Sequence, residues 1–248
     1  QRQMCIRDRR FSNKIHSAFS DRQGNLWMCT HSKGLEKITF RSSFFSMMTP
    51  EPHRYESLSN EVRALCEDTE HNLWVGLKDG KIRIYDKNRT ELGYFTETGT
   101  ISHAGIPLKG NTYCIFQDSK HNIWIATKGE GLVKARPQGG GHYKLTRYCH
   151  SRDDIYSLSD NNVYCVYEDV KGRIWVATFG GGINYLTHNR GGREIFVNHR
   201  NNLKGFPIDN CHKVRFVTGD HRGNIWIATT VGALMAVSYT HLTLPTIA

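Results

Sequence analysis

The chain alternates short apolar segments with polar turns, and this pattern recurs about every fifty residues. Residues 162–168 place apolar side chains at every second position, as expected for a strand with one buried face. A turn, an apolar run at Ile174–Thr178, a glycine-rich turn and a third run at 182–186 follow. Period-two alternation without a sustained 3.6-residue stripe predicts β-strands and argues against a helical solenoid.

Five tryptophans mark the repeat, at intervals of 47, 50, 51 and 51 residues. An aspartate lies six residues before each tryptophan, and an aliphatic residue lies immediately before it and eight residues after it. The pairs are Asp21 and Trp27, Asp68 and Trp74, Asp118 and Trp124, Asp169 and Trp175, and Asp220 and Trp226. Five copies in one register indicate a repeat architecture with these ten residues as its structural frame.

The aspartate is predicted to open a turn, because its carboxylate can accept backbone N–H groups just ahead of it. Three copies carry a glycine that can take positive φ in this turn: Gly24, Gly172 and Gly223. His71 and His121 replace that glycine in two copies. Either the histidine takes the left-handed conformation or the following asparagine, Asn72 or Asn122, takes it.

Each period also has room for a fourth, outer strand, predicted at residues 93–95, 142–145 and 194–197. The small residues Ala126, Ala177 and Ala228 are expected to allow close packing against a neighbouring sheet. Four strands per copy predict an all-β fold, a partial β-propeller of about five four-stranded antiparallel blades. The second copy departs from the pattern at Leu77 and Lys81, where the others have threonine and a small residue.

The two ends of the chain fit no copy of the repeat. We interpret residues 1–10 as a non-native leader and residues 237–248 as a non-native tail, because both resemble translated adapter strings. Residues 11–236 are the propeller repeats, with the last blade truncated. Five blades are fewer than closed propellers of this kind commonly need, so we expect a fragment of a longer protein. The sequence contains no visible signal peptide or membrane helix.

The net charge of +10 falls to +7 without residues 1–10. The basic residues are scattered through every copy, which argues against a nucleic-acid site and is compatible with simple solubility or with an acidic ligand. Seven cysteines form no C-x-x-C pair, and Cys114 and Cys165 fit small core positions. No H-E-x-x-H, phosphate-binding loop or G-x-S-x-G motif is present. We therefore expect no catalytic residue, metal site or cofactor in this chain.

The copies D-x-x-G-N-I-W-I-A-T-x-G-x-G-L, with preceding S-L-S segments at 57–59 and 157–159, resemble the two-component regulator propeller repeat. The resemblance spans nearly all of residues 11–236. It implies the periplasmic sensor region of a hybrid two-component histidine kinase of Bacteroidetes, joined to the membrane only by segments outside this chain. It also implies an oligosaccharide ligand, a homodimeric full receptor, control of polysaccharide-utilisation genes, and no chemistry in this region.

Propellers bind ligands where the loops before the first strands and the turns between second and third strands converge. The richest such loop is residues 150–162, in which Arg152 can pair with a carboxylate or sulfate, Asp153 can accept sugar hydroxyls and Tyr156 can stack on a pyranose. Three further residues are expected on the same face: Phe179, Arg200 and Asn201. The alternative is that all six are ordinary solvated loop residues.

Other functional classes stay open at this point. A secreted sialidase-like glycosidase also has a propeller with aspartate turns, but its turn is one residue shorter and no distinctive arginine set is found here. A quinoprotein propeller would need cofactor-enclosing features that are absent from the sequence. A protein-interaction scaffold cannot be separated from a sugar sensor by sequence.

Overall fold

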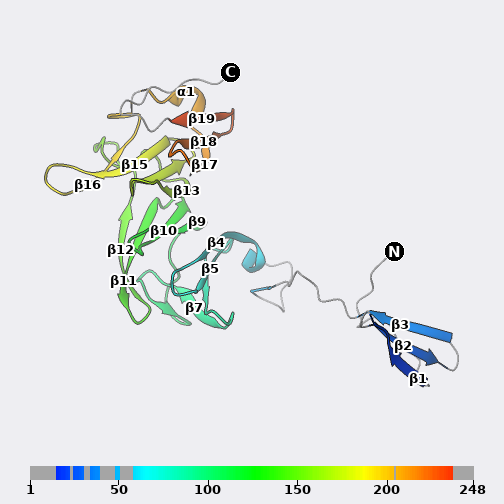
Figure 1. Ribbon diagram of the computed structural model, residues 1–248. Coiled ribbons are helices and arrows are strands. Elements are labelled where there is room, and N and C mark those ends of the chain that lie inside the picture. The colour runs from blue at the N-terminus through cyan, green and yellow to red at the C-terminus, as the bar shows by residue number, and fades with distance from the viewer. Residues whose placement is uncertain are drawn as a thin grey trace. The chain divides into compact units, whose positions relative to one another are not determined.

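The computed structural model describes residues 15–22, 25–30, 34–39, 48–50, 58–203 and 205–236, and the chain divides into two units, residues 1–48 and 49–248. In the first unit, β1 (Ile15–Ser20), β2 (Asn25–Thr30) and β3 (Gly34–Thr39) form one antiparallel sheet that carries Trp27 (Figure 1). The predicted leader and tail, residues 1–10 and 237–248, lie outside the described residues.

The second unit contains four antiparallel sheets in chain order, running from cyan to red in Figure 1. We call them blades two to five, after the tryptophan that each contains. Blade two follows a 3-10 turn (Leu58–Asn60) and consists of β4 (Val62–Glu67), β5 (Leu73–Leu77), β6 (Ile82–Tyr85), β7 (Glu91–Phe95) and β8 (Ile101–Ser102). Blade three consists of β9 (Asn111–Gln117), β10 (Ile123–Lys128), β11 (Leu132–Gly139) and β12 (His142–Tyr148).

Blade four has β13 (Val163–Glu168), β14 (Ile174–Thr178), β15 (Gly182–His188) and β16 (Glu194–Val197). The short helix α1 (Ile208–Cys211) then leads into blade five, with β17 (Val214–Gly219), β18 (Ile225–Thr229) and β19 (Ala233–Ala236). None of the helices in the described segments is long and apolar enough to cross a membrane.

The prediction of antiparallel propeller blades is confirmed, and blades three and four have the four predicted strands, whereas three strands of blade five lie in the described residues. The three predicted outer strands lie within β7, β12 and β16, and each sheet pairs its strands in simple succession, with a fifth short strand added to blade two. The first strands β4, β9, β13 and β17 lie next to one another from blade to blade and are therefore the inner strands. Figure 1 shows blades three and four side by side in this arrangement.

The core lies between the blades, because each sheet buries a face against the next sheet. Trp74, Trp124 and Trp175 are at most 2% exposed. Trp74 packs in the layer between blades two and three, Trp124 in the layer between three and four, and Trp175 in the layer between four and five. Each of blades two to five therefore shares its core with a neighbouring blade, as expected for stacked repeats.

Close packing at the small residues is confirmed for Ala126 and Ala177, which are fully buried. Cys165 is likewise buried in the core between blades four and five, with Cys114 packed against it. The prediction is wrong for Ala228, which is exposed on β18. The physical reason is that, within the second unit, blade five packs against blade four on one side and no other sheet of this unit covers its other face.

The aspartate turn forms as predicted and has one additional bond. In blade three, Oδ1 of Asp118 accepts the backbone N–H groups of Lys120 at 3.0 Å and Asn122 at 2.8 Å. Its Oδ2 accepts the indole N–H of Trp124 at 2.8 Å. The aspartate–indole bond recurs at 2.8 to 3.0 Å in the other copies, between Asp21 and Trp27, Asp68 and Trp74, Asp169 and Trp175, and Asp220 and Trp226.

The histidines in the turn take the left-handed conformation themselves. His71 has φ 64° and His121 has φ 63°, close to the φ of 71° at Gly172 and 80° at Gly223. The following asparagines keep ordinary backbone and use their side-chain amides instead, since Asn122 donates from Nδ2 to Asp118 at 2.8 Å. The turn therefore has one backbone shape in these copies, whether glycine or histidine occupies it.

The turn between the second and third strands is held by a threonine hydroxyl. Thr127 donates from Oγ1 to the carbonyl of Gly131 at 2.7 Å, and Thr178 donates to the carbonyl of Gly182 at 2.8 Å. Leu77 replaces this threonine in blade two and is fully buried against Val75 and Tyr85. The departure noted in the sequence thus exchanges a turn hydrogen bond for apolar packing.

Candidate ligand-binding face

The connections between strands lie at the two opposite ends of the blades of the second unit. We call the end that carries the loops before the inner strands, together with the turns between second and third strands, the loop face. The opposite end carries the aspartate turns and is called the turn face. The 150–162 loop lies on the loop face of blade four, where Phe179 donates its backbone N–H to the carbonyl of Asn162 at 2.8 Å.

The 150–162 loop has a defined shape because it is bonded internally and anchored by one apolar side chain. Leu158 is fully buried in the core between blades three and four. The backbone N–H of His150 donates to Oδ1 of Asn161 at 2.7 Å, and the His150 ring lies 2.9 Å from the carbonyl of Leu158. Both ends of the loop are thereby held together.

Arg200 and Asn201 support this loop from the side. Arg200 donates from its guanidinium to the carbonyls of Ser151 at 3.0 Å and Arg152 at 2.9 Å. Asn201 is 5% exposed, and its amide donates to the carbonyl of Ile155 at 2.8 Å. In this structure these two predicted site residues use their side chains to position the loop backbone, and Asn201 is buried, away from a ligand on the surface.

Three predicted residues of the loop present their side chains to solvent. Arg152 and Asp153 are exposed, and Tyr156 is 41% exposed. The neighbouring Asp154 is occupied, because its Oδ2 accepts from the guanidinium of Arg193 at 2.7 Å. A cation, a carboxylate and an aromatic ring therefore stand on one braced loop, which suits recognition of a polyhydroxyl ligand that carries charge.

Phe179 has different neighbours from the other predicted residues. Its ring stacks on Tyr164 with centroids 4.9 Å apart, and the Arg215 guanidinium lies 5.0 Å and the Lys213 ammonium 5.7 Å from its centroid. We did not predict these three contacts. The available signal was periodicity, since Tyr164 and Arg215 each stand eleven residues before a repeat tryptophan.

A buried polar network lies beneath the loop face of blade four. Asn184 is fully buried; its Oδ1 accepts from the Ser159 backbone N–H at 3.0 Å and from the Asn198 amide at 3.1 Å. Gly181 must be a glycine here, because an added Cβ would lie 2.4 Å from the hydroxyl of Ser159. The network fixes the loop to the sheet, and sequence reasoning missed it because single asparagines carry no pattern.

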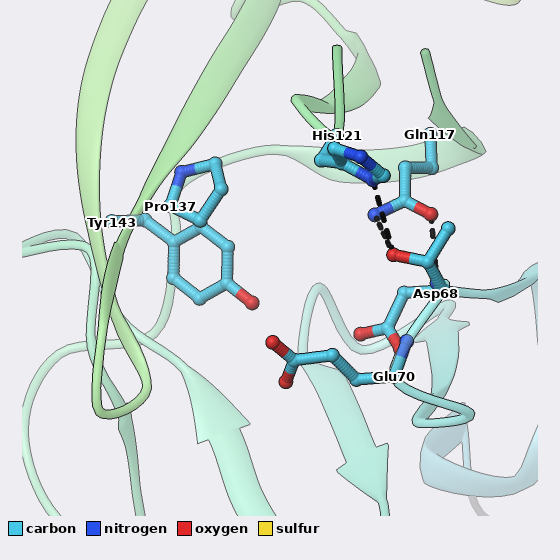
Figure 2. Close-up of a pocket in the computed structure, with 7 residues that line it drawn as sticks. Asp68, Glu70, Gln117, His121, Pro137 and Tyr143 are labelled. Carbon is cyan, nitrogen blue, oxygen red and sulfur yellow. Dashed lines mark hydrogen bonds between the residues drawn. The ribbon is translucent and has the colours of Figure 1, made fainter. Parts of the chain in front are cut away.

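A pocket of about 330 Å³ opens on the turn face between blades two and three (Figure 2). It is lined by Asp68, Thr69, Glu70, Gln117, His121, Pro137 and Tyr143. Hydrogen bonds between the two blades close one side of the pocket. The Thr69 hydroxyl lies 3.2 Å from Nδ1 of His121, and the Thr69 backbone N–H donates to Oε1 of Gln117 at 2.8 Å. Figure 2 shows the Tyr143 hydroxyl directed toward the Glu70 carboxylate.

The ionisable side chains that line the pocket come from the contact between blades two and three. Burial, together with the negative charges of Asp68 and Glu70, raises the pKa of Tyr143 to about 12, so the phenol stays protonated at neutral pH. Asp68 is held by its turn and by the indole of Trp74 at 2.9 Å. The described residues contain no group of three or more metal-ligating side chains. A corresponding contact joins blades three and four, where Ser119 bonds Glu168.

The fold and its repeated aspartate–tryptophan turns define a β-propeller repeat protein. The family model described as two component regulator propeller matches residues 10–32, 57–79, 107–129 and 157–180, and each match contains one of the first four repeat tryptophans. These four segments thus match the two component regulator propeller repeat, the same repeat that the sequence motifs resemble.

Among curated proteins, histidine kinase P4 of Formosa agariphila is 27% identical over 89 residues, which is 36% of this chain and 6% of that protein. Among solved structures, the extracellular domain of the hybrid two component system BT3049 from B. thetaiotaomicron has a TM-score of 0.57 at 23% identity, over 91% of this chain and 28% of that one. The corresponding domain of BT4673 has a TM-score of 0.56 at 21% identity, over 95% and 31%.

An inactive variant of virginiamycin B lyase from Staphylococcus aureus has a TM-score of 0.53 at 12% identity, over 94% of this chain and 70% of that one. Identities this low establish a shared propeller fold and not a shared activity. The chain spans less than a third of the two sensor domains that it resembles.

Proposed function

We propose that this chain is part of the extracytoplasmic, ligand-sensing propeller region of a hybrid two-component histidine kinase. The observation that carries the proposal is the family match, which falls on the repeated turns in four blades and joins this chain to the repeats of such regulators. The likeness to the extracellular domains of two hybrid two component systems supports the same proposal at the level of the fold. In this proposal the region is periplasmic and the full receptor is a homodimer.

The ligand in this proposal is an oligosaccharide, and its binding would switch on genes for polysaccharide utilisation. Recognition is assigned to the loop face of blade four, where Arg152, Asp153 and Tyr156 expose a cation, a carboxylate and an aromatic ring. The bracing by Arg200 and Asn201 supports this assignment, since a preformed loop loses little conformational entropy when a ligand binds.

An enzymatic role is less well supported by the same geometry. The repeat aspartates are the only carboxylates that recur in every copy, and each already accepts an indole N–H and at least one backbone N–H in its turn. A carboxylate in such a turn cannot approach a glycosidic bond as general acid or nucleophile. The region is therefore proposed to bind its ligand without transforming it.

A glycan panel tests the proposal, with binding to the purified chain measured by calorimetry. At least one oligosaccharide should bind saturably, and Arg152→Ala and Tyr156→Ala should each weaken it by about tenfold or more. Arg136→Ala is the matched control, because Arg136 is an exposed arginine on the outer part of blade three. Absence of binding by every glycan would overturn the proposal, and equal affinity of all three variants would remove the loop from it.

A further inference from the structure

Each inner strand contains a β-bulge at the same repeat position. In blade four, Val163 pairs with Thr178 and Cys165 pairs with Ala177, so Tyr164 between them has no partner in the ladder. The bulge recurs in all five copies, at the residue eleven positions before the tryptophan: His16, Arg63, Tyr113, Tyr164 and Arg215. A bulge redirects a side chain, and bulges are frequent beside functional sites.

The bulged residues of blades two, three and four touch one another across the blades, and the Phe179 ring links Tyr164 to the bulged Arg215 of blade five. The Arg63 guanidinium donates to the Tyr113 hydroxyl at 2.6 Å and lies 4.9 Å from its ring centroid. The Tyr113 and Tyr164 rings have centroids 4.4 Å apart, and the Tyr164 and Phe179 rings stack at 4.9 Å. With the two cations beside Phe179 they form what we call the inner-strand row: Arg63, Tyr113, Tyr164, Phe179, Lys213 and Arg215.

The positive charges in the inner-strand row are not balanced evenly. Arg63 has a carboxylate partner, Glu61, at 3.2 Å. At the other end, Lys213 and Arg215 share the Phe179 ring, are both exposed, and have no carboxylate within 4.0 Å among the residues that the structure describes. Two like charges gathered on one ring without a counter-charge attract an anion.

The row also offers hydroxyl groups. Because the Tyr113 oxygen accepts from Arg63, its own proton is directed elsewhere and can be donated. Burial and the neighbouring Tyr113, with which the Tyr164 hydroxyl shares a hydrogen bond, raise the pKa of Tyr164, so this phenol stays protonated. The rings lie too close to each other for a planar base to enter between them, which argues against single-stranded nucleic acid.

We propose that the inner-strand row binds an anionic sugar, with Arg215 and Lys213 on its carboxylate or sulfate group and the tyrosine hydroxyls on its ring oxygens. This inference rests on the proposed sensing function and adds to it the class of ligand. Charge-assisted bonds to the anion supply most of the selectivity, since a neutral sugar leaves the two cations without a partner. The row is separate from Arg152, Asp153 and Tyr156, because among the described residues the Phe179 ring is contacted by Tyr164, Lys213 and Arg215.

The test compares charged and neutral forms of the same sugars. Trigalacturonate is measured against its methyl ester and sulfated lactose against lactose, with the purified chain, by calorimetry up to about 10 mM. At least one charged probe should bind about tenfold more tightly than its neutral match and should weaken as salt is raised. Which of the two binds distinguishes a carboxylate from a sulfate ligand.

Variants then locate the site. Arg215→Met and Lys213→Met should each weaken the charged probe by about tenfold. Arg222→Met is the matched control, because Arg222 is exposed on the turn face of the same blade and should leave affinity unchanged. Tyr164→Phe keeps the stacked ring and removes the hydroxyl, and it should weaken the charged probe while the melting temperature stays unchanged.

Several outcomes overturn the inference. They are equal affinity for charged and neutral forms, equal effects of the Arg215 and Arg222 variants, no saturation by either charged probe, or tighter binding of an oligothymidylate control. If a neutral glycan binds and only Tyr156→Ala weakens it, the inner-strand row is excluded while the proposed sensing function stands. If no glycan of any kind binds, both fail together.

Discussion

The indole Nε1 of Trp124 donates a 2.8 Å hydrogen bond to Oδ2 of Asp118, six residues earlier in the chain. Oδ1 of the same carboxylate accepts the backbone N–H of Asn122 at 2.8 Å. Asp118 is 6% exposed and Trp124 is 1% exposed. One buried carboxylate thus closes the turn with one oxygen and fixes the orientation of the core tryptophan with the other.

Asp118→Asn should lower the free energy of unfolding by about 2 to 3 kcal/mol. An asparagine has one oxygen acceptor in place of two. Its amide NH2 would therefore face either the backbone N–H groups of the turn or the indole N–H of Trp124, and one of these donors would lose its acceptor. Urea denaturation monitored by tryptophan fluorescence measures the loss. The control is Asp79→Asn, since Asp79 is exposed and, within the part of the chain that the structure describes, accepts only the Lys81 backbone N–H, at 2.9 Å. A loss of similar size in both variants would contradict this role of Asp118.

His71→Gly should raise the free energy of unfolding by about 0.5 to 1 kcal/mol. At φ 64°, His71 carries left-handed strain that glycine does not, and this outweighs the extra backbone freedom of glycine in the unfolded chain. Its ring contact with Glu67 at 2.8 Å is exposed and contributes little. His71→Ala keeps the strain and should give no gain. A gain in the alanine variant would show that the ring, and not the backbone, is unfavourable.

Thr127→Val should lower the free energy of unfolding by about 1 to 2 kcal/mol. The substitution preserves the shape of a fully buried side chain and removes the hydroxyl that donates to the Gly131 carbonyl at 2.7 Å. Thr146→Val on the exposed side of β12 is the control and should change stability by less than about 0.5 kcal/mol. Chemical denaturation of the two variants compares them directly, and indistinguishable midpoints would refute the turn assignment.

Acid should unfold the propeller partly through Asp169. Burial alone would raise the pKa of this carboxyl, but bonds from the Trp175 indole and from Arg173 outweigh burial and hold the pKa below its ordinary value. A carboxyl with a lowered folded-state pKa stabilises the fold above its unfolded pKa of about 3.9 and loses that contribution as pH falls toward the lower value.

Urea midpoints at pH 7, 5, 4 and 3 test this dependence. Asp169→Asn should be less stable than the native chain at neutral pH and should lose less stability below about pH 4, because one titrating carboxyl is gone. The pKa of Asp220 is also lowered, because its carboxylate accepts hydrogen bonds from the side chains of Trp226 and Asn224. Parallel pH curves for the native chain and the Asp169 variant would contradict the assignment.

The sequence repeat predicted structure correctly at positions where the same residue type has the same structural role in each copy. The turn aspartates, the inner strand at residues 162–168 and the outer strand at 194–197 all appear where the pattern placed them. The indole bond escaped notice because an aspartate and a tryptophan six residues apart meet only after the turn between them has folded. Ala228 shows the opposite limit, because a small residue packs closely only where a neighbouring sheet covers it.

The predicted binding residues fall into exposed and buried groups, which the sequence alone did not separate. Arg152, Asp153 and Tyr156 are exposed on their loop, as polar and aromatic residues in a long connection tend to be. The sequence could not distinguish them from Asn201, whose amide is buried against the carbonyls of Ile155 and Phe196. An asparagine serves a ligand or its own backbone equally well, and only the path of the chain decides which.

By itself the sequence determined the repeat, the strand order within a blade and the turn chemistry, because these depend on contacts between residues near in the chain and recur in five copies. The tertiary structure alone decided which side chains meet across blades. Successive members of the set Arg63, Tyr113, Tyr164 and Arg215 are about fifty residues apart in sequence. They lie side by side because stacked sheets place equal repeat positions next to one another, and because a bulge at each position turns the side chain away from the strand ladder.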